Sequence, residues 1–139
     1  MTLLQKNQKV KEIKTLNPAQ SVVLEASELN KRLFTSGPAG TGKTMLALEI
    51  AEKKASLDKN VLFLCFNQFL AEDLKQVSTN FKVQTFHSFL LEITGLNVPN
   101  ENLNSFFNEE LIEAAFDKII EKNIKFDTLV IDEFQDLAI

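Results

Sequence analysis

The fold is decided by the stretch Gly37-Pro38-Ala39-Gly40-Thr41-Gly42-Lys43-Thr44, which lies between an apolar run and a run of helix-forming residues. It fits the pattern Gly, four residues, Gly-Lys-Ser/Thr, which is typical of a loop that wraps backbone N–H groups around phosphates. Residues 32–36 predict a strand before the loop, and residues 44–55 predict a helix after it. A helix that begins at the loop adds the positive end of its dipole to the site. This order of strand, loop and helix predicts a nucleotide-binding site.

Four residues of the loop have distinct expected roles. Gly37 and Gly42 lack a Cβ atom, so the backbone can approach the phosphates closely. Lys43 is expected to reach the β- and γ-phosphates, and the hydroxyl of Thr44 is expected to hold Mg²⁺. The alternative is a chance match in a glycine-containing turn, which the flanking strand and helix patterns disfavour.

Composition limits the classes of protein to consider. The chain has 139 residues, a net charge of −4 and a single cysteine, Cys65, which excludes an internal disulfide. It has no apolar run of eighteen residues, and its first residues lack the apolar stretch of a signal peptide, so we expect a cytoplasmic protein with no membrane partner. The chain has no overall basic charge, so any binding to nucleic acid would depend on local patches.

The rest of the chain alternates between strand and helix patterns. Residues 1–16 are Lys-rich and read as a tail or a frayed amphipathic helix, and Asn17 and Pro18 favour a helix start. Strands are predicted at 60–66, 81–85 and 127–131, and helices at 67–77, at about 85–91 and, as one amphipathic helix, at 103–122. The alternation predicts an α/β domain with a mostly parallel sheet.

Two positions extend the site beyond the loop. Asp132 and Glu133 follow the predicted strand at 127–131, and ligands bind at the carboxyl ends of strands in open α/β sheets. Asp132 is therefore placed to hold Mg²⁺, directly or through water, and Glu133 to polarise an attacking water. The alternative is an acidic turn that ends a strand. Gln20 lies in the first turn of its helix, where its amide could read the edge of adenine or could simply be solvated.

Together these motifs resemble the first RecA-like lobe of superfamily 1 DNA helicases of the UvrD/Rep/PcrA type. The resemblance covers about residues 16–137 and rests on five stretches: Leu16-Asn17-Pro18-Ala19-Gln20, residues 37–44, Phe66-Asn67, Thr85-Phe86-His87-Ser88 and Asp132-Glu133-Phe134-Gln135-Asp136. It implies a P-loop NTPase fold with three α/β/α layers. It also implies ATP and Mg²⁺ as cofactors, and a hydrolase whose ATP turnover drives movement along single-stranded DNA, with RNA as the alternative.

The resemblance also implies roles for single residues. Gln20 corresponds to the residue that recognises adenine, Lys43 and Thr44 to the phosphate and magnesium residues, and Asp132 to the magnesium carboxylate. Glu133 corresponds to the catalytic base, and Gln135 to the residue that contacts the γ-phosphate and couples hydrolysis to DNA. The family contacts single-stranded DNA at the positions of Phe66, Asn67, Thr85, His87 and Ser88. The structural alternatives are a core role for Phe66 and a helix-start role for His87.

The sequence departs from the family in two respects. Gln68-Phe69-Leu70 stand where the family usually has Lys-Ala-Ala, which puts the DNA contact of that segment in doubt. The family also continues into a second RecA-like lobe with arginine fingers. We therefore expect residues 1–15 to be a tail or linker and residues 16–139 to be an incomplete lobe that binds nucleotide but hydrolyses it slowly by itself. The alternatives are a P-loop ATPase of another class and a non-catalytic ATP-binding module of a larger protein.

Overall fold

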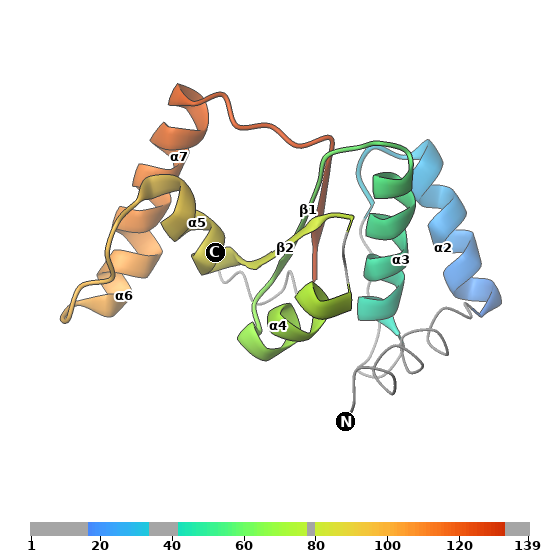
Figure 1. The fold of residues 1–139 in the computed structure, drawn as a ribbon, viewed down its shortest axis with the longest axis horizontal. Coiled ribbons are helices and arrows are strands. Elements are labelled where there is room, and N and C mark those ends of the chain that lie inside the picture. Colours follow the sequence, from blue (N-terminus) through green and yellow to red (C-terminus); the bar gives the residue numbers. More distant parts are fainter. Residues whose placement is uncertain (1–16, 34–41, 78–79, 133–139) are drawn as a thin grey trace.

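The computed structural model describes residues 17–33, 42–77 and 80–132 (Figure 1). The first described elements along the chain are α2 (Pro18–Leu29), α3 (Lys43–Ser56), β1 (Val61–Cys65), α4 (Gln68–Val77) and β2 (Lys82–Thr85). They are followed by α5 (Phe86–Thr94), α6 (Leu103–Ser105), a π-helical turn η1 (Phe106–Glu110), α7 (Leu111–Glu121) and β3 (Thr128–Ile131).

The three described strands form a parallel sheet in the order β2-β1-β3. In the register of the sheet, Cys65 lies opposite Thr85 and Leu64 lies opposite Ile131. The carboxyl ends of the three strands therefore meet at one edge. The chain segments that follow them, at Phe66, Phe86 and Asp132, start from this edge, which is the edge where the sequence predicts the ligand site.

Helices cover both faces of β1, and all five of its residues are buried. Val61, Phe63 and Cys65 point into a core with α3 and α4, which includes Leu48 and Ala51 of α3. Leu62 and Leu64 point the opposite way, into a second core with α5, η1 and α7, built by Phe89, Leu90, Phe106, Leu111 and Ala115. A strand that is buried on both faces explains the continuous apolar run at 61–65. This arrangement confirms the predicted three-layer α/β/α class with a parallel sheet.

Short polar side chains begin three of the helices. Asn17 and Gln20 form a reciprocal capping box at the start of α2, where Pro18 occupies the first turn. The Asn67 side chain accepts from the backbone N–H groups of Phe69 and Leu70 at the start of α4, at 2.9 and 3.2 Å. Thr85 caps α5 in the same way, through a 3.1 Å bond from the N–H of Ser88. The chain therefore turns from strand into helix immediately after both β1 and β2.

The predicted helix at 103–122 is observed as a continuous helical segment over residues 103–121, but it contains a π-helical turn, η1, between α6 and α7. Phe106 and Phe107 are neighbours in sequence, and both pack toward the second core, with their rings in a T-shaped pair at 5.1 Å. We attribute the π-turn to this double packing, since a wider turn adds a residue within the helix. Apolar spacings of three and four residues do not distinguish such a turn from a regular helix.

The strand predicted before the phosphate loop is only partly within the described residues. Arg32 and Leu33 are not in a strand, and residues 34–36 lie outside the described part of the chain. The predicted tail or amphipathic helix at 1–16 also lies outside it. Among the described helices, none is sufficiently long and apolar to cross a membrane.

The central strand offers a test of this core. Phe63 is fully buried, so Phe63→Ala should lower the free energy of unfolding by about 3–5 kcal/mol, from lost apolar burial and the cavity left behind. The measurement is urea denaturation followed by circular dichroism. Phe69→Ala is the matched control, because the Phe69 side chain is 79% exposed. Equal losses in the two variants would contradict the central position of β1.

Candidate functional site

The described part of the phosphate loop is its last turn. Gly42 has a left-handed backbone, with φ of 82°, and it is the N-cap residue directly before α3. Lys43 and Thr44 form the first turn of α3, a helix of fourteen residues. Gly42 has no side chain that could cap α3, so the N-cap position leaves the first backbone N–H groups of the helix without a side-chain cap. Such N–H groups at a helix start can bind an anion. The loop residues Gly37, Pro38, Ala39, Gly40 and Thr41 lie outside the described residues.

The structure places Gln20 directly against this turn. A Cβ atom at Gly42 would come too close to the amide nitrogen of the Gln20 side chain, which would have to move aside, and the positive φ of Gly42 is the stronger reason for a glycine here. The amide oxygen of Gln20 accepts from the backbone N–H of Asn17 at 3.1 Å, within the capping box. The side chain is half-buried, with its nitrogen toward the loop, which differs from the solvated helix residue of the alternative interpretation.

A second contact joins the start of α3 to the end of β3. The Thr44 hydroxyl donates a 2.7 Å hydrogen bond to Oδ2 of Asp132, across 88 residues of sequence. Asp132 is only 6% exposed, and its backbone N–H donates to the carbonyl oxygen of Leu64 at 2.9 Å. The end of β3, held against β1, therefore positions this carboxylate beside the start of α3 (Figure 1). Glu133 and Gln135, the predicted base and coupling residue, lie outside the described residues.

The oxygen atoms of Thr44 and Asp132 fit a magnesium ion. Mg²⁺ prefers hard oxygen ligands and is usually held by one or two protein groups, while water and substrate phosphate oxygens fill its other positions. Within residues 17–33, 42–77 and 80–132, no three His, Cys, Asp or Glu side chains gather as a metal cluster. The described donors therefore suit an ion that arrives with a nucleotide rather than an all-protein metal site.

The residues predicted to contact nucleic acid lie at the ends of β1 and β2. Asn67, His87 and Ser88 are exposed, whereas Phe66 and Thr85 are half-buried. The side-chain oxygens of Asn67 and Thr85 already accept backbone N–H groups as helix caps. These two residues thus have a structural role, which the sequence signals by a short polar residue directly before each helix.

An aromatic row links the ends of the two strands to η1. The ring centroids of Phe66 and Phe86 are 5.5 Å apart, those of Phe86 and His87 are 5.8 Å apart, and those of His87 and Phe107 are 4.7 Å apart. Loss of solvent around the ring lowers the pKa of His87 below its ordinary value of 6.5. His87 therefore presents a neutral imidazole at neutral pH, which can donate one hydrogen bond but contributes no charge.

The sequence analysis did not predict a polar cluster that joins β2 to α5. Gln84 is 7% exposed and donates from its amide to Glu92 of α5, and Lys82 donates to the other oxygen of Glu92 at 2.8 Å. The hydrogen bond from Lys82, followed by that from Gln84, lowers the pKa of Glu92. These contacts fasten α5 to β2 and so orient the Thr85–Ser88 segment. The alternating pattern at 81–85 predicts a strand, but it does not show that Gln84 meets a side chain of the helix that follows.

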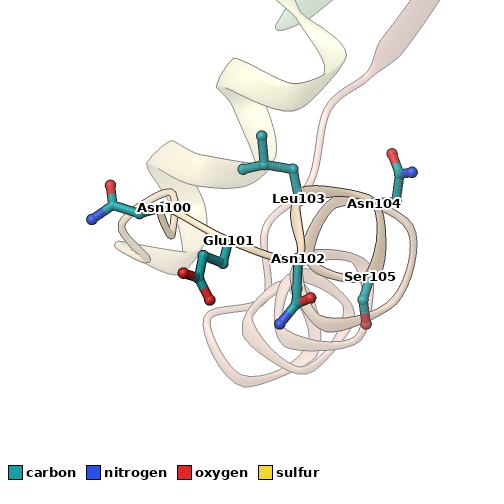
Figure 2. Close-up of a pocket in the computed structure, with 6 residues that line it drawn as sticks. All are labelled: Asn100, Glu101, Asn102, Leu103, Asn104 and Ser105. Carbon is teal, nitrogen blue, oxygen red and sulfur yellow. The ribbon is translucent and has the colours of Figure 1, made fainter.

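Two other features do not add to the site. Burial raises the pKa of the Cys65 thiol, which makes this cysteine a poor nucleophile. An open depression lies at α6, lined by six consecutive residues: Asn100, Glu101, Asn102, Leu103, Asn104 and Ser105 (Figure 2). Their side chains spread in different directions around the turn and do not converge on one point. This depression shares no residue with the nucleotide site.

Comparison with known proteins gives two matches. Residues 19–139 match the family described as AAA domain. The chain is also similar to origin recognition complex subunit 1 of Plasmodium falciparum (isolate 3D7), with 29% identity over 123 residues, which is 88% of this chain and 10% of that protein. The chain thus spans about a tenth of the length of this relative. No solved structure matches.

The contact between Thr44 and Asp132 predicts a specific effect of Thr44→Val. Valine keeps the shape of threonine but removes the hydroxyl, so the buried Asp132 carboxylate loses a donor, at an expected cost of about 1–3 kcal/mol in unfolding free energy. Urea denaturation without nucleotide measures this cost. Thr44→Ser keeps the hydroxyl and should lose much less stability. A valine variant as stable as the serine variant would show that the contact contributes nothing.

The environment of His87 predicts a pH effect. Its folded pKa lies below the unfolded value of about 6.5, so protonation favours the unfolded state. The stability gained from the neutral ring is present above pH 6.5 and is lost as the pH falls below it. An NMR titration of the ring should give a pKa below 6.5, and Phe107→Ala should move it toward 6.5 by admitting water. Phe116→Ala, at an exposed phenylalanine, is the control. An unchanged pKa in the Phe107 variant would contradict the stated cause.

Proposed function

The chain belongs to the family of AAA domains, and from its motif resemblance to superfamily 1 DNA helicases we propose that it is the ATP-binding lobe of such a helicase. The family membership makes it an ATPase domain of the P-loop class, and such domains bind ATP and typically Mg²⁺. The observation that carries the ATP-binding part of the proposal is the contact of Thr44 with Asp132, which joins the phosphate loop to the end of β3. The proposal adds that hydrolysis drives movement along single-stranded DNA.

In this proposal each residue acts on one part of the nucleotide. Lys43 binds the β- and γ-phosphates, while Gln20, beside Gly42, hydrogen-bonds the edge of adenine. When bound, Mg²⁺ supplies positive charge that neutralises the phosphates, and Thr44 and Asp132 are the residues that would hold it. Glu133 orients and polarises the attacking water, and Gln135 senses the γ-phosphate. A second RecA-like lobe completes the cleft, with residues 16–139 as the first lobe and residues 1–15 as a tail.

The proposed nucleic-acid contacts start from the same sheet edge as the nucleotide site. β1 lies between β2, which ends at Thr85, and β3, which ends next to Asp132. Exposed Ser88 and the N–H of His87 are suited to backbone phosphates, and the ring of Phe66 is suited to a base, at about 1–3 kcal/mol per stacked base. In this proposal, only β1 separates the end of β3, at the nucleotide site, from the end of β2, at the proposed DNA contacts.

A second candidate is an ATPase subunit of an origin recognition complex. The observation that favours it is the similarity, over 88% of this chain, to a protein of that name. The two candidates share the nucleotide site and differ in what hydrolysis serves. A helicase lobe responds to single strands of any sequence, whereas an origin-recognition subunit would act at selected sites.

The ATP site is tested by calorimetric titration of Mg-ATP into wild type and Lys43→Ala. Loss of the phosphate-binding ammonium should weaken affinity at least about tenfold. Lys54→Ala, in the last turn of the same helix, removes the same charge far from the loop and should bind as wild type does. Equal affinity in wild type and Lys43→Ala, or no binding by either, would contradict an ATP site in this chain.

The nucleic-acid part is tested with a fluorescently labelled single-stranded oligonucleotide. Phe66→Ala should weaken binding about 5- to 100-fold, as expected for one lost stacking contact, whereas Phe69→Ala, outside the aromatic row, should have little effect. Binding that does not depend on Phe66 would contradict this DNA path. Selective binding to particular duplex sequences, with no affinity for single strands, would favour the second candidate.

A further inference from the structure

The outward side of α7 carries an exposed apolar ridge. Ile112, Phe116 and Ile120 follow one another at intervals of four residues, and they are 42%, 66% and 67% exposed. About 100° around the same helix from this ridge, Leu111 and Ala115 are buried in the second core. A helix with apolar residues on two sides normally has both sides covered. Within the described part of the chain, α7 has only one side covered, so the ridge formed by Ile112, Phe116 and Ile120 is a surface for a partner.

An acidic row runs beside this ridge and restricts the chemistry of the partner. Glu113, Asp117 and Glu121 are exposed, and each follows one ridge residue directly, so at about 100° per residue they line one flank of the ridge. Glu121 forms an ion pair with Lys118 at 2.9 Å, which lowers the pKa of Glu121. A partner that is complementary to both rows must offer apolar side chains together with positive charge.

This chain contains a segment of that composition. Residues 1–16 hold four lysines and a single glutamate, interspersed with the apolar residues Leu3, Leu4, Val10, Ile13 and Leu16. They lead into α2, which Figure 1 shows at the end of the molecule opposite α7. Because α2, to which this segment is joined, and α7 are at opposite ends of the molecule, a contact between copies is favoured over one within a copy. We propose that residues 1–16 of one copy dock on the α7 ridge of a second copy.

The size and charge of the ridge set the expected behaviour. Three partly exposed side chains make a small interface, so the dissociation constant should be on the order of micromolar or weaker. The flanking charges are exposed and therefore screened by salt, so the association should weaken as ionic strength rises. Nucleotide is not required, which makes the association independent of the proposed ATPase activity.

The direct test is sedimentation of the full chain over a wide range of concentrations. Wild type should gain mass as concentration rises, and Phe116→Ser should weaken the association at least about tenfold. Phe69→Ser is the matched control, because it removes an exposed phenylalanine of another helix. A wild type that stays monomeric at every concentration would overturn the proposal. So would equal association of wild type and Phe116→Ser.

Charge variants identify the occupant of the ridge and remain informative if Phe116→Ser misfolds. Replacing Lys6, Lys9, Lys11 and Lys14 by glutamine should weaken association as strongly as Phe116→Ser does. The double variant Glu113→Lys with Asp117→Lys should also associate more weakly. Replacing the four lysines of residues 1–16 by glutamate in this double variant should restore the association. If association persists in the glutamine variant, residues 1–16 are not the occupant and the proposal is wrong. That result would indicate that the α7 ridges of two copies contact each other. Failure of the reversed charges to restore association would equally contradict the proposed pairing.

Discussion

Parallel pairing of β1 with β2 on one side and β3 on the other brings three strand ends to one edge of the sheet, and the candidate site depends on this pairing. Strands of a parallel sheet share their direction, so whatever follows each strand emerges at the same edge. The Thr44–Asp132 hydrogen bond, the caps of α4 and α5, and the aromatic row all start there. β1 can occupy the middle only because helices bury both of its faces.

Several residues at this edge serve the fold and the proposed chemistry together. The Asn67 and Thr85 side chains begin helices, and Gln20 closes a capping box while it rests against Gly42. A cap contributes about 1 kcal/mol to stability, so removing one of these side chains changes the local backbone as well as any ligand contact. Phe66 and His87 differ in this respect, because the contacts of their side chains in the structure are with other rings of the aromatic row.

Much of the fold was predictable because local signals were strong. The apolar run at 61–65, the alternation at 82–85 and the strand at 128–131 were each located within one or two residues of their observed bounds. The helix at 103–122 was also located, but the π-turn within it was not, because the apolar spacing of a π-turn resembles that of a regular helix. The reason for the turn is the packing of Phe106 and Phe107. The hydrogen bond of Gln84 and the salt bridge of Lys82 to Glu92 were equally hidden, since nothing in the sequence of β2 shows which helix residue they face.

The sequence by itself determined the local features: the phosphate-loop pattern, the helix starts at Asn17 and Thr85, and the alternation of strands and helices. These are decided by backbone capping and side-chain periodicity over a few residues, which act within a segment. Only the tertiary structure decided the order β2-β1-β3, the contact of Gln20 with Gly42 and that of Thr44 with Asp132. Such contacts join residues up to 88 positions apart, and they form because the two cores bury both faces of β1 at once.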